Sequence, residues 1–450
     1  MLVLAHGIAG RADLPIPESL FAAAAAVVLV VSFVALALGW SKPKLAGLPE
    51  RRLFVLPRAA EVVLGALGVF VFFLVVYAGI AGTDLPNENL APTAVYVGFW
   101  VGVPFASLLF GNVFSLLSPW RAVGRATGWA GSRLGALPEP LEYPERIGRL
   151  PAAVGLFAFA ICELAWARPG EPGPLAILML IYFVIMLVGM SLYGVEPWVR
   201  NADAFGVLFG LIGSLAPVGR DPDGRLFLRV PFAGAAKNPL ATGTVALLIV
   251  AVGSTGFDGA REGAVFNPLA KDMQSFFVDL GTTVGLGLEL AFTIGLGMAV
   301  ALVGAIWAVG MAGMKPPESA PSRRALGLAF AHTLIPIAAG YLVAHYFSLL
   351  AYSGQNLWPL INDPLGDGSD LFGGASAGVD YGVVSATAIW YVQVGALVAG
   401  HVAALVLAHD RALELYGSAR RATRSQIVML ILMIAFTCVG LWLLSAAMES

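Results

Sequence analysis

The chain has 450 residues, of which 58% are hydrophobic and 12% are charged, whereas an ordinary soluble domain carries about 25% charged residues. A soluble chain of this length needs far more charge to cover its surface, and two cysteines cannot form a disulfide framework. The formal net charge of −2 and the lack of basic clusters with interleaved aromatics argue against nucleic-acid binding. Composition therefore predicts an all-α, polytopic integral membrane protein that forms one transmembrane helical domain over residues 1–450.

Ten apolar stretches are long enough to cross a hydrocarbon layer of roughly 30 Å, which takes about 20 residues of helix. In chain order they are 17–40, 60–82, 93–117, 150–168, 174–194, 239–257, 284–312, 325–352, 384–410 and 426–447. A further apolar piece, 202–216, is short and rich in glycine. Hydropathy alone does not decide whether this piece crosses the membrane.

The distribution of lysine and arginine predicts the orientation, because cytoplasmic loops concentrate these residues. With the N-terminus outside, 22 of the 26 basic residues lie in cytoplasmic loops, which include 118–149 and 195–238. The four that lie outside are Arg11, Arg168, Arg261 and Lys271. This division holds only if 202–216 does not cross, so we expect an interfacial or re-entrant helix there. Both termini are then outside.

Three loops carry further signals. The turn-forming residues 220–225 followed by the apolar segment 226–230 predict a short hairpin or extended piece. Outside, residues 267–280 alternate apolar and polar side chains at helical spacing, which favours a helix along the membrane surface. The outer loop 353–383 is long, acidic and rich in glycine, and loops of this length are often functional.

Histidine is concentrated on the eighth and ninth spans. Four of the five histidines lie there: His332, His345, His401 and His409. A neutral imidazole is the commonest metal ligand and also relays protons near pH 7. At about 1.5 Å per residue, His332 and His401 lie roughly 10 and 13 Å from the cytoplasmic ends of their spans. Neighbouring antiparallel helices would then bring this level pair together, with Gly400 permitting close approach.

The other histidines suggest separate levels. His345 lies in the outer third of the eighth span, level with Gln393 of the ninth, and Tyr341 shares its face one turn below. His409 lies at the inner rim. A start of the chain upstream would make His6 the first residue after a signal-peptide cleavage site. The alternative for every intramembrane histidine is a hydrogen-bonded packing residue without chemistry.

Carboxylates extend the predicted outer site. Asp363 and Asp367 of the acidic loop either cap this site, attract a cation, or serve only as turn residues. Glu163 and Glu289 lie about one turn inside the outer face of the membrane. Each either reaches the interface with its carboxylate or faces the bundle and joins the outer site.

Several stretches resemble a known family. They are FAHTLIPI (330–337), AHYFSLL (344–350), NDPLG (362–366), WYVQ (390–393), GHV (400–402) and AH (408–409), with AHG (5–7) and RADLPIP (11–17) near the N-terminus. Together they resemble the bacterial, largely actinobacterial, polytopic membrane proteins known as fenitrothion hydrolases. The resemblance implies a bacterial plasma membrane and hydrolysis of an organophosphate ester. It assigns no role to any residue.

Three functions are consistent with these features. In a metal-dependent phosphoester hydrolase, His345, Gln393, Asp363 and His6 would hold zinc or copper, which activates water. In a transporter of a metal ion or a proton-coupled solute, the buried histidines would relay protons through discontinuous helices. In a haem-binding electron-transfer subunit, His332 and His401 would be axial ligands. Lipid and a small molecule or ion are the predicted partners, and the sequence leaves open a homo-oligomer or partner membrane subunits.

Overall fold

The computed structural model describes residues 18–449 except 136–138, 240, 262 and 264–265. Most of this chain is helical, and seven helices or continuous helical runs are long and apolar enough to cross a membrane. They are α1 (Glu18–Gly39), α2 (Arg58–Ala81), the run α3–η2–α4 (Leu90–Phe110), α8 (Pro172–Tyr193), α14 (Val284–Ala312), the run α15–η3–α16–η4–α17 (Arg323–Asn362) and α18 (Ala386–Tyr416). The prediction of a helical, multi-pass membrane protein is confirmed at this level.

The other apolar helices are broken or short. Helices α19 (Ala419–Ser425) and α20 (Ile427–Glu449) meet at an angle of 43°, and the bent pair is an eighth candidate span. Helix α7 (Leu150–Leu164) and α12 (Thr244–Ala260) are roughly 22 and 26 Å long at 1.5 Å per residue. Both are therefore a little shorter than the hydrocarbon layer. The seven long helices, the broken pair and these two correspond one by one to the ten predicted spans.

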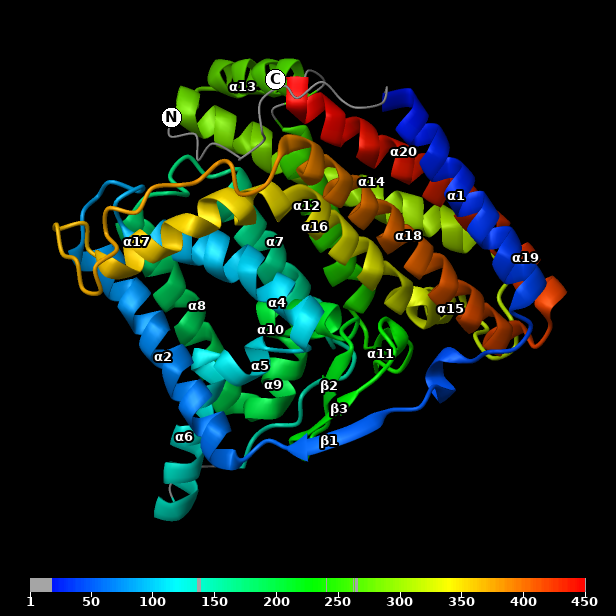
Figure 1. Cartoon of the computed structure of the whole chain (residues 1–450), viewed down its shortest axis with the longest axis horizontal. Helices are drawn as coiled ribbons and strands as arrows, with labels where there is room; N and C mark the ends of the chain where they lie inside the picture. Colours follow the sequence, from blue (N-terminus) through cyan, green and yellow to red (C-terminus); the bar gives the residue numbers. More distant parts are fainter. Residues whose placement is uncertain (1–17, 136–138, 240, 262, 264–265, 450) are drawn as a thin grey trace.

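Several short helices lie at the ends of the bundle. They are α5 (Phe114–Leu117), α6 (Pro119–Leu134), α9 (Val195–Asn201), α11 (Ala233–Ala236), α13 (Phe266–Asp279) and the single turn η1 (Leu45–Gly47). Helix α13 lies against α14, as Figure 1 shows at the upper edge of the view. It matches the amphipathic surface helix predicted at 267–280.

Three short strands accompany the helices of this predominantly α-helical chain. Strands β1 (Arg51–Val55), β2 (Val218–Arg220) and β3 (Arg225–Leu228) form an antiparallel sheet in the order β1-β3-β2. The β2–β3 hairpin is the one predicted at 220–230. Strand β1 was missed because its partner lies more than 150 residues away, and local patterns carry no signal for such a pairing.

Loops that share a predicted cytoplasmic location contact one another. The pairing of β1 with β3 joins the loop 41–59 to the segment 195–238. The Tyr416 hydroxyl donates a hydrogen bond of 2.7 Å to the Lys315 carbonyl. This contact joins the loop after the predicted span 384–410 to the loop after the predicted span 284–312. Figure 1 shows β1, β3 and α6 together at the lower edge of the bundle.

Loops predicted to lie outside also meet. The Thr83 N–H donates to the Leu365 carbonyl (2.7 Å), so the loop after α2 supports the acidic loop 353–383. The Tyr96 hydroxyl donates to the Pro169 carbonyl (2.9 Å) in the turn between α7 and α8. The contacts therefore sort these loops into the same two groups as the basic residues did.

The short helix α10 (Ala204–Gly213) lies inside the bundle. Its side chains are almost all buried, and it packs on α4, α7, α9 and α16. The Asp203 carboxylate caps its first turn, accepting from the Gly206 N–H at 3.0 Å. The Arg229 guanidinium donates to the Gly213 carbonyl (2.9 Å) in the last turn. An acid at the N-terminus and a base at the C-terminus both oppose the helix dipole and bind the two ends of this buried helix.

Helices α16 (Leu334–Ser353) and α18 pack with backbones in contact. A Cβ added at Gly400 would lie 2.5 Å from the Pro336 carbonyl oxygen and 3.2 Å from the Gly340 Cα. The expected close approach at Gly400 is therefore present. We expect Gly400→Ala to destabilise the protein by about 1–3 kcal/mol, because the helices must separate. Thermal unfolding in detergent measures this loss, and Gly395→Ala on the same helix, where a Cβ meets nothing within 4 Å, is the matched control.

Candidate functional site

His332 and His401 have different surroundings. His332 lies in the 3₁₀ turn η3 (Ala331–Thr333), where Pro336 interrupts regular helix by removing a hydrogen bond to residue 332. Its imidazole neighbours the Leu407 backbone and the Arg411 charge. Leu407 is six residues beyond His401, or roughly 9 Å along α18. The level pair predicted from counting residues is thus offset by more than one turn.

His401 belongs to an aromatic junction of α16, α18 and α20. Its Nδ1 hydrogen bonds to the Leu397 carbonyl (2.8 Å), and its ring centre lies 6.1 Å from that of Tyr341 and 6.3 Å from that of Phe436. The Tyr341 hydroxyl donates to the Phe436 carbonyl at 3.3 Å. The Nε2 atom of His401 is buried and has no hydrogen-bond partner among the described residues. This environment is that of a packing histidine.

His409 and its neighbour tie the end of α1 to α18. The buried His409 ring contacts the Trp40 carbonyl through Nε2 (3.0 Å) and the Gln426 amide through Nδ1 (3.3 Å). The Asp410 carboxylate accepts from the Trp40 indole (3.0 Å) and from the Lys44 backbone N–H (2.6 Å). Every polar contact here links elements of the fold, so a structural role accounts for both residues.

The acidic loop uses its carboxylates for its own turns. Asp363 accepts from the backbone N–H groups of Asp367 (3.0 Å) and Gly368 (2.9 Å). Asp367 in turn accepts from the Ser369 side chain and backbone, and these hydrogen bonds lower the pKa of Asp367. The turn-residue alternative therefore accounts for the contacts of both carboxylates.

The remaining members of the predicted outer site have contacts of their own or none with His345 among the described residues. Gln393 is buried on α18, and no hydrogen bond to His345 is recorded within the described residues. Glu289 accepts from the Ala167 backbone N–H (2.9 Å) in the turn that follows α7. His6 lies outside the described residues.

His345 instead faces α12, where a buried carboxylate meets it. Its Nε2 lies 2.8 Å from Asp258 Oδ2, and the Tyr346 hydroxyl donates to the same oxygen at 3.1 Å. The Asp258 side chain is 1% exposed and that of His345 is 15% exposed. An imidazole and a phenol thus share one oxygen of a carboxylate that is shielded from solvent.

Two further ionisable groups complete this cluster. Arg261 Nε lies 3.3 Å from Asp258 Oδ1, and Arg261 also donates to the Leu164 carbonyl (3.2 Å) at the end of α7. Glu163, one of the predicted outer carboxylates, interacts electrostatically with both Asp258 and Arg261. Among the described residues, Asp258 and Glu163 therefore share one arginine, and Asp258 also contacts the His345 imidazole. We call Asp258, Glu163, Arg261, His345 and Tyr346 the acid–histidine cluster.

The sequence contained a signal for part of this cluster. Asp258 and Arg261 directly follow the apolar run that ends at residue 257, at a spacing of i and i+3 that places them on one helix face. The predicted span 239–257 stops just before Asp258, which leaves both residues in the predicted outer loop. In the structure α12 continues to Ala260, so Asp258 lies in its last turn and Arg261 directly follows it.

The described residues contain no group of three or more His, Cys, Asp or Glu side chains that could hold a metal ion. The acid–histidine cluster contains an arginine, whose charge opposes cation binding at the same carboxylate. The zinc or copper site and the haem site stay predictions.

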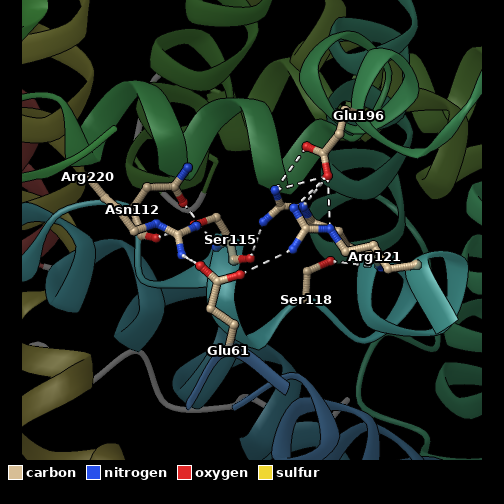
Figure 2. A network of polar contacts seen from close by, with 8 residues as sticks. Glu61, Asn112, Ser115, Ser118, Arg121, Glu196 and Arg220 are labelled. Carbon is tan, nitrogen blue, oxygen red and sulfur yellow. Dashed lines mark hydrogen bonds and ion pairs between the residues drawn. The ribbon is translucent and has the colours of Figure 1, made fainter. Parts of the chain in front are cut away.

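A second polar network lies on the opposite side of the bundle, where cytoplasmic loops were predicted. Glu61 of α2 lies 2.9 Å from Arg220 of β2 and 3.5 Å from Arg125 of α6. Figure 2 shows the Glu61 carboxylate directed toward Arg220. Glu196 of α9 binds Arg125 (2.8 Å) and Arg121 (2.9 Å). Three arginines and two glutamates thus join α2, α6, α9 and the sheet.

Glu196 is expected to stabilise this network. Burial opposes its ionisation, but hydrogen bonds and charges from Arg121 and Arg125 outweigh burial and lower the pKa of Glu196. Its contribution is therefore present above the usual glutamate pKa of about 4.3 and is lost as the pH falls through the lower folded value. We expect Glu196→Gln to cost about 1 kcal/mol in thermal unfolding at pH 7, since the pairs are half exposed. Glu414→Gln, which removes one exposed pair with Arg411, should change stability less.

Comparison of the chain with models of known protein families, with curated proteins and with solved structures gives no match. The assignment of function therefore depends on the geometry of the chain itself. The resemblance to fenitrothion hydrolases stays a prediction.

Proposed function

We propose that the protein is a proton-coupled membrane transporter whose protonation site is the acid–histidine cluster. The observation that carries this proposal is the shared, buried Asp258 carboxylate with His345 at 2.8 Å, beside Arg261 and Glu163. Asp258 and Glu163 are the carboxylates of this cluster and Arg261 is its positive charge. Binding or release of a proton at either carboxylate changes the charge that a low-dielectric site exposes to a solute.

The positions of the helices support a site that can be reached. The cluster lies at the ends of the short helices α7 and α12, whereas His345 is the twelfth of the 20 residues of α16. The neighbouring run η2 (Ala94–Gly102) is π-helical, and η3 interrupts the α15–α16 run. Irregular helices and a re-entrant helix such as α10 are typical of transporters that rearrange around a central site.

The proposed topology has ten crossings with both termini outside, in the plasma membrane of a bacterium. The seven long helices, the broken α19–α20 pair, α7 and α12 supply these crossings, and α10 turns back on the cytoplasmic side. The contacts between loops and the excess of basic residues both support this arrangement. Reporter fusions at 130 and 315 should report the cytoplasm, and fusions at 170 and 375 the outside.

Access from both sides of the membrane tests the function without knowledge of the solute. A cysteine at position 259 places a thiol beside His345, because a Cβ at Gly259 lies 3.6 Å from the imidazole. We expect Gly259→Cys, with Cys162 and Cys438 replaced by serine, to react with a charged, impermeant thiol reagent from outside in cells. The same variant should also react from inside in inverted vesicles.

The control for this experiment is Gly395→Cys, which lies on α18 with open space around its Cβ and should face lipid. It should react from neither side. Reaction of Gly259→Cys from one side only, or from neither, contradicts a transporter. Hydrolysis of fenitrothion by the purified protein, unchanged by Asp258→Asn, would favour the enzymatic alternative and leave the cluster a structural role.

A further inference from the structure

The segment that connects α1 to α2 forms an exposed basic edge on the predicted cytoplasmic side. We use the name "basic edge" for residues 41–58, which include β1. Figure 1 shows β1 running along the lower edge of the bundle from the end of α1 toward the start of α2. The basic members of this edge are all exposed: Lys42, Lys44, Arg51, Arg52 and Arg58.

The charge of the basic edge is largely uncompensated. Glu50 is its only acidic residue, and its carboxylate pairs with Lys237 at 2.7 Å. Within the described residues no ion pair is recorded for Lys42, Arg51, Arg52 or Arg58. Lys44 lies over the Trp40 ring at 4.8 Å and has no carboxylate partner there. The edge therefore presents several positive charges to whatever surrounds it.

Apolar side chains stand beside these charges. In β1, Leu53 is 42%, Phe54 60% and Val55 49% exposed, although the strand pairs with β3 through its backbone. The helices on either side continue this apolar surface, since Leu38 near the end of α1 and Val62 near the start of α2 are 82% and 70% exposed. Such side chains on membrane-crossing helices face acyl chains, so β1 lies where lipid chains give way to headgroups.

We propose that the basic edge binds an anionic phospholipid of the cytoplasmic leaflet. Arg51 and Arg52 contact the phosphate of the headgroup, for which a guanidinium has matching geometry, and Leu53 to Val55 contact the upper acyl chains. The proposed topology decides only which leaflet supplies the lipid. Binding does not depend on the proposed transport, so failure of one proposal leaves the other intact.

Thermal unfolding of the purified full-length protein in a neutral detergent tests the proposal. Added dioleoyl phosphatidylglycerol is expected to raise the Tm in a saturable manner, because a ligand that binds only the folded state stabilises it. Dioleoyl phosphatidylcholine at the same concentrations should give no such shift. In Arg51→Gln/Arg52→Gln the lipid concentration for half of the shift should rise about 30-fold, since each charge near an anionic surface contributes roughly fivefold.

The matched control is Arg323→Gln/Arg324→Gln, which removes the same charge from another exposed pair at the start of α15. It should keep the wild-type response. If both double variants lose the lipid-induced rise in Tm equally, the effect comes from overall charge and the proposal is wrong. If phosphatidylcholine raises the Tm as much as phosphatidylglycerol does, the arginines do not recognise an anionic headgroup and the proposal is also wrong. Phe54→Ser should also weaken binding. If glycerophosphoglycerol alone, without acyl chains, reproduces the shift, the site binds a soluble phosphate ester and the lipid proposal is wrong.

Discussion

Replacing Asp258 with asparagine is expected to reduce proton entry into proteoliposomes to the level of protein-free vesicles. The amide keeps the shape of the carboxylate but cannot bind or release a proton at neutral pH. The vesicles contain the dye pyranine, which reports the internal pH. They are loaded with potassium, and valinomycin lets potassium leave, which makes the interior negative. Zn²⁺, Mn²⁺, glycine, lactate and glucose are added one at a time, and the variant is compared with the wild type on whichever gives the largest signal.

The control for this prediction is Asp272→Asn, which neutralises an exposed aspartate on α13 and should retain wild-type proton entry. His345→Gln keeps a hydrogen-bond donor toward Asp258 but does not titrate, so it should also lose proton entry. Wild-type acidification by Asp258→Asn would show that protons do not pass through the cluster. Both outcomes are interpreted only for variants that elute at the wild-type volume and have the wild-type Tm. This check is necessary because the substitutions change the contacts of Asp258, which could unfold the protein.

Much of the architecture was predictable because it follows from local hydropathy and charge. Each predicted span has a helical counterpart, and the loops that contact one another are those that lysine and arginine placed together. The β2–β3 hairpin was visible in its turn residues, since Asp221 accepts from the N–H groups of Asp223 and Arg225 within the turn. These features depend on neighbouring residues and on transfer to lipid, which a sequence displays directly.

The site was less predictable because it depends on which helix faces meet. Histidines on consecutive spans are close in sequence order, yet His345 faces α12 and His401 faces α20. A position along a helix fixes depth, but the angular position of its neighbours is a property of the whole bundle. Glu163 and His345 were identified as candidates, whereas Asp258, which brings them together, was assigned to a loop. The cluster thus joins two of the predicted candidates through a partner that depth counting did not reveal.

The position of helix α10 was predictable from the sequence, but the contacts that hold its ends were not. The excess of basic residues after residue 216 predicted that this apolar segment does not cross, and its burial agrees with a segment that enters the bundle. The prediction did not reveal what holds its ends. Asp203 binds the Trp120 indole (2.7 Å) and the Tyr182 hydroxyl (3.0 Å), while Arg229 comes from the β3 side of the hairpin.

Asp203→Ala is therefore expected to destabilise the protein by about 3–5 kcal/mol. The substitution removes an N-cap, worth about 1 kcal/mol, and leaves the buried Trp120 N–H and Tyr182 O–H without their acceptor. Such a loss is a large part of the 5–15 kcal/mol that stabilises a typical folded protein. Unfolding in detergent, followed by tryptophan fluorescence, measures it, and the expected result is a low Tm with a reduced yield of folded protein.

Two comparisons separate the cap from a general effect of losing a charge. Asp223→Ala removes an exposed aspartate from the hairpin turn and should change stability by less than about 0.5 kcal/mol. Asp203→Asn keeps one carbonyl oxygen as an acceptor, so it should lie between wild type and Asp203→Ala. If Asp203→Ala instead unfolds with the Tm of the wild type, the carboxylate does not hold α10 in place. Apolar packing alone would then hold α10 in the bundle. The Asp203 carboxylate and the Arg229 guanidinium would not be needed to stabilise the buried ends of the helix.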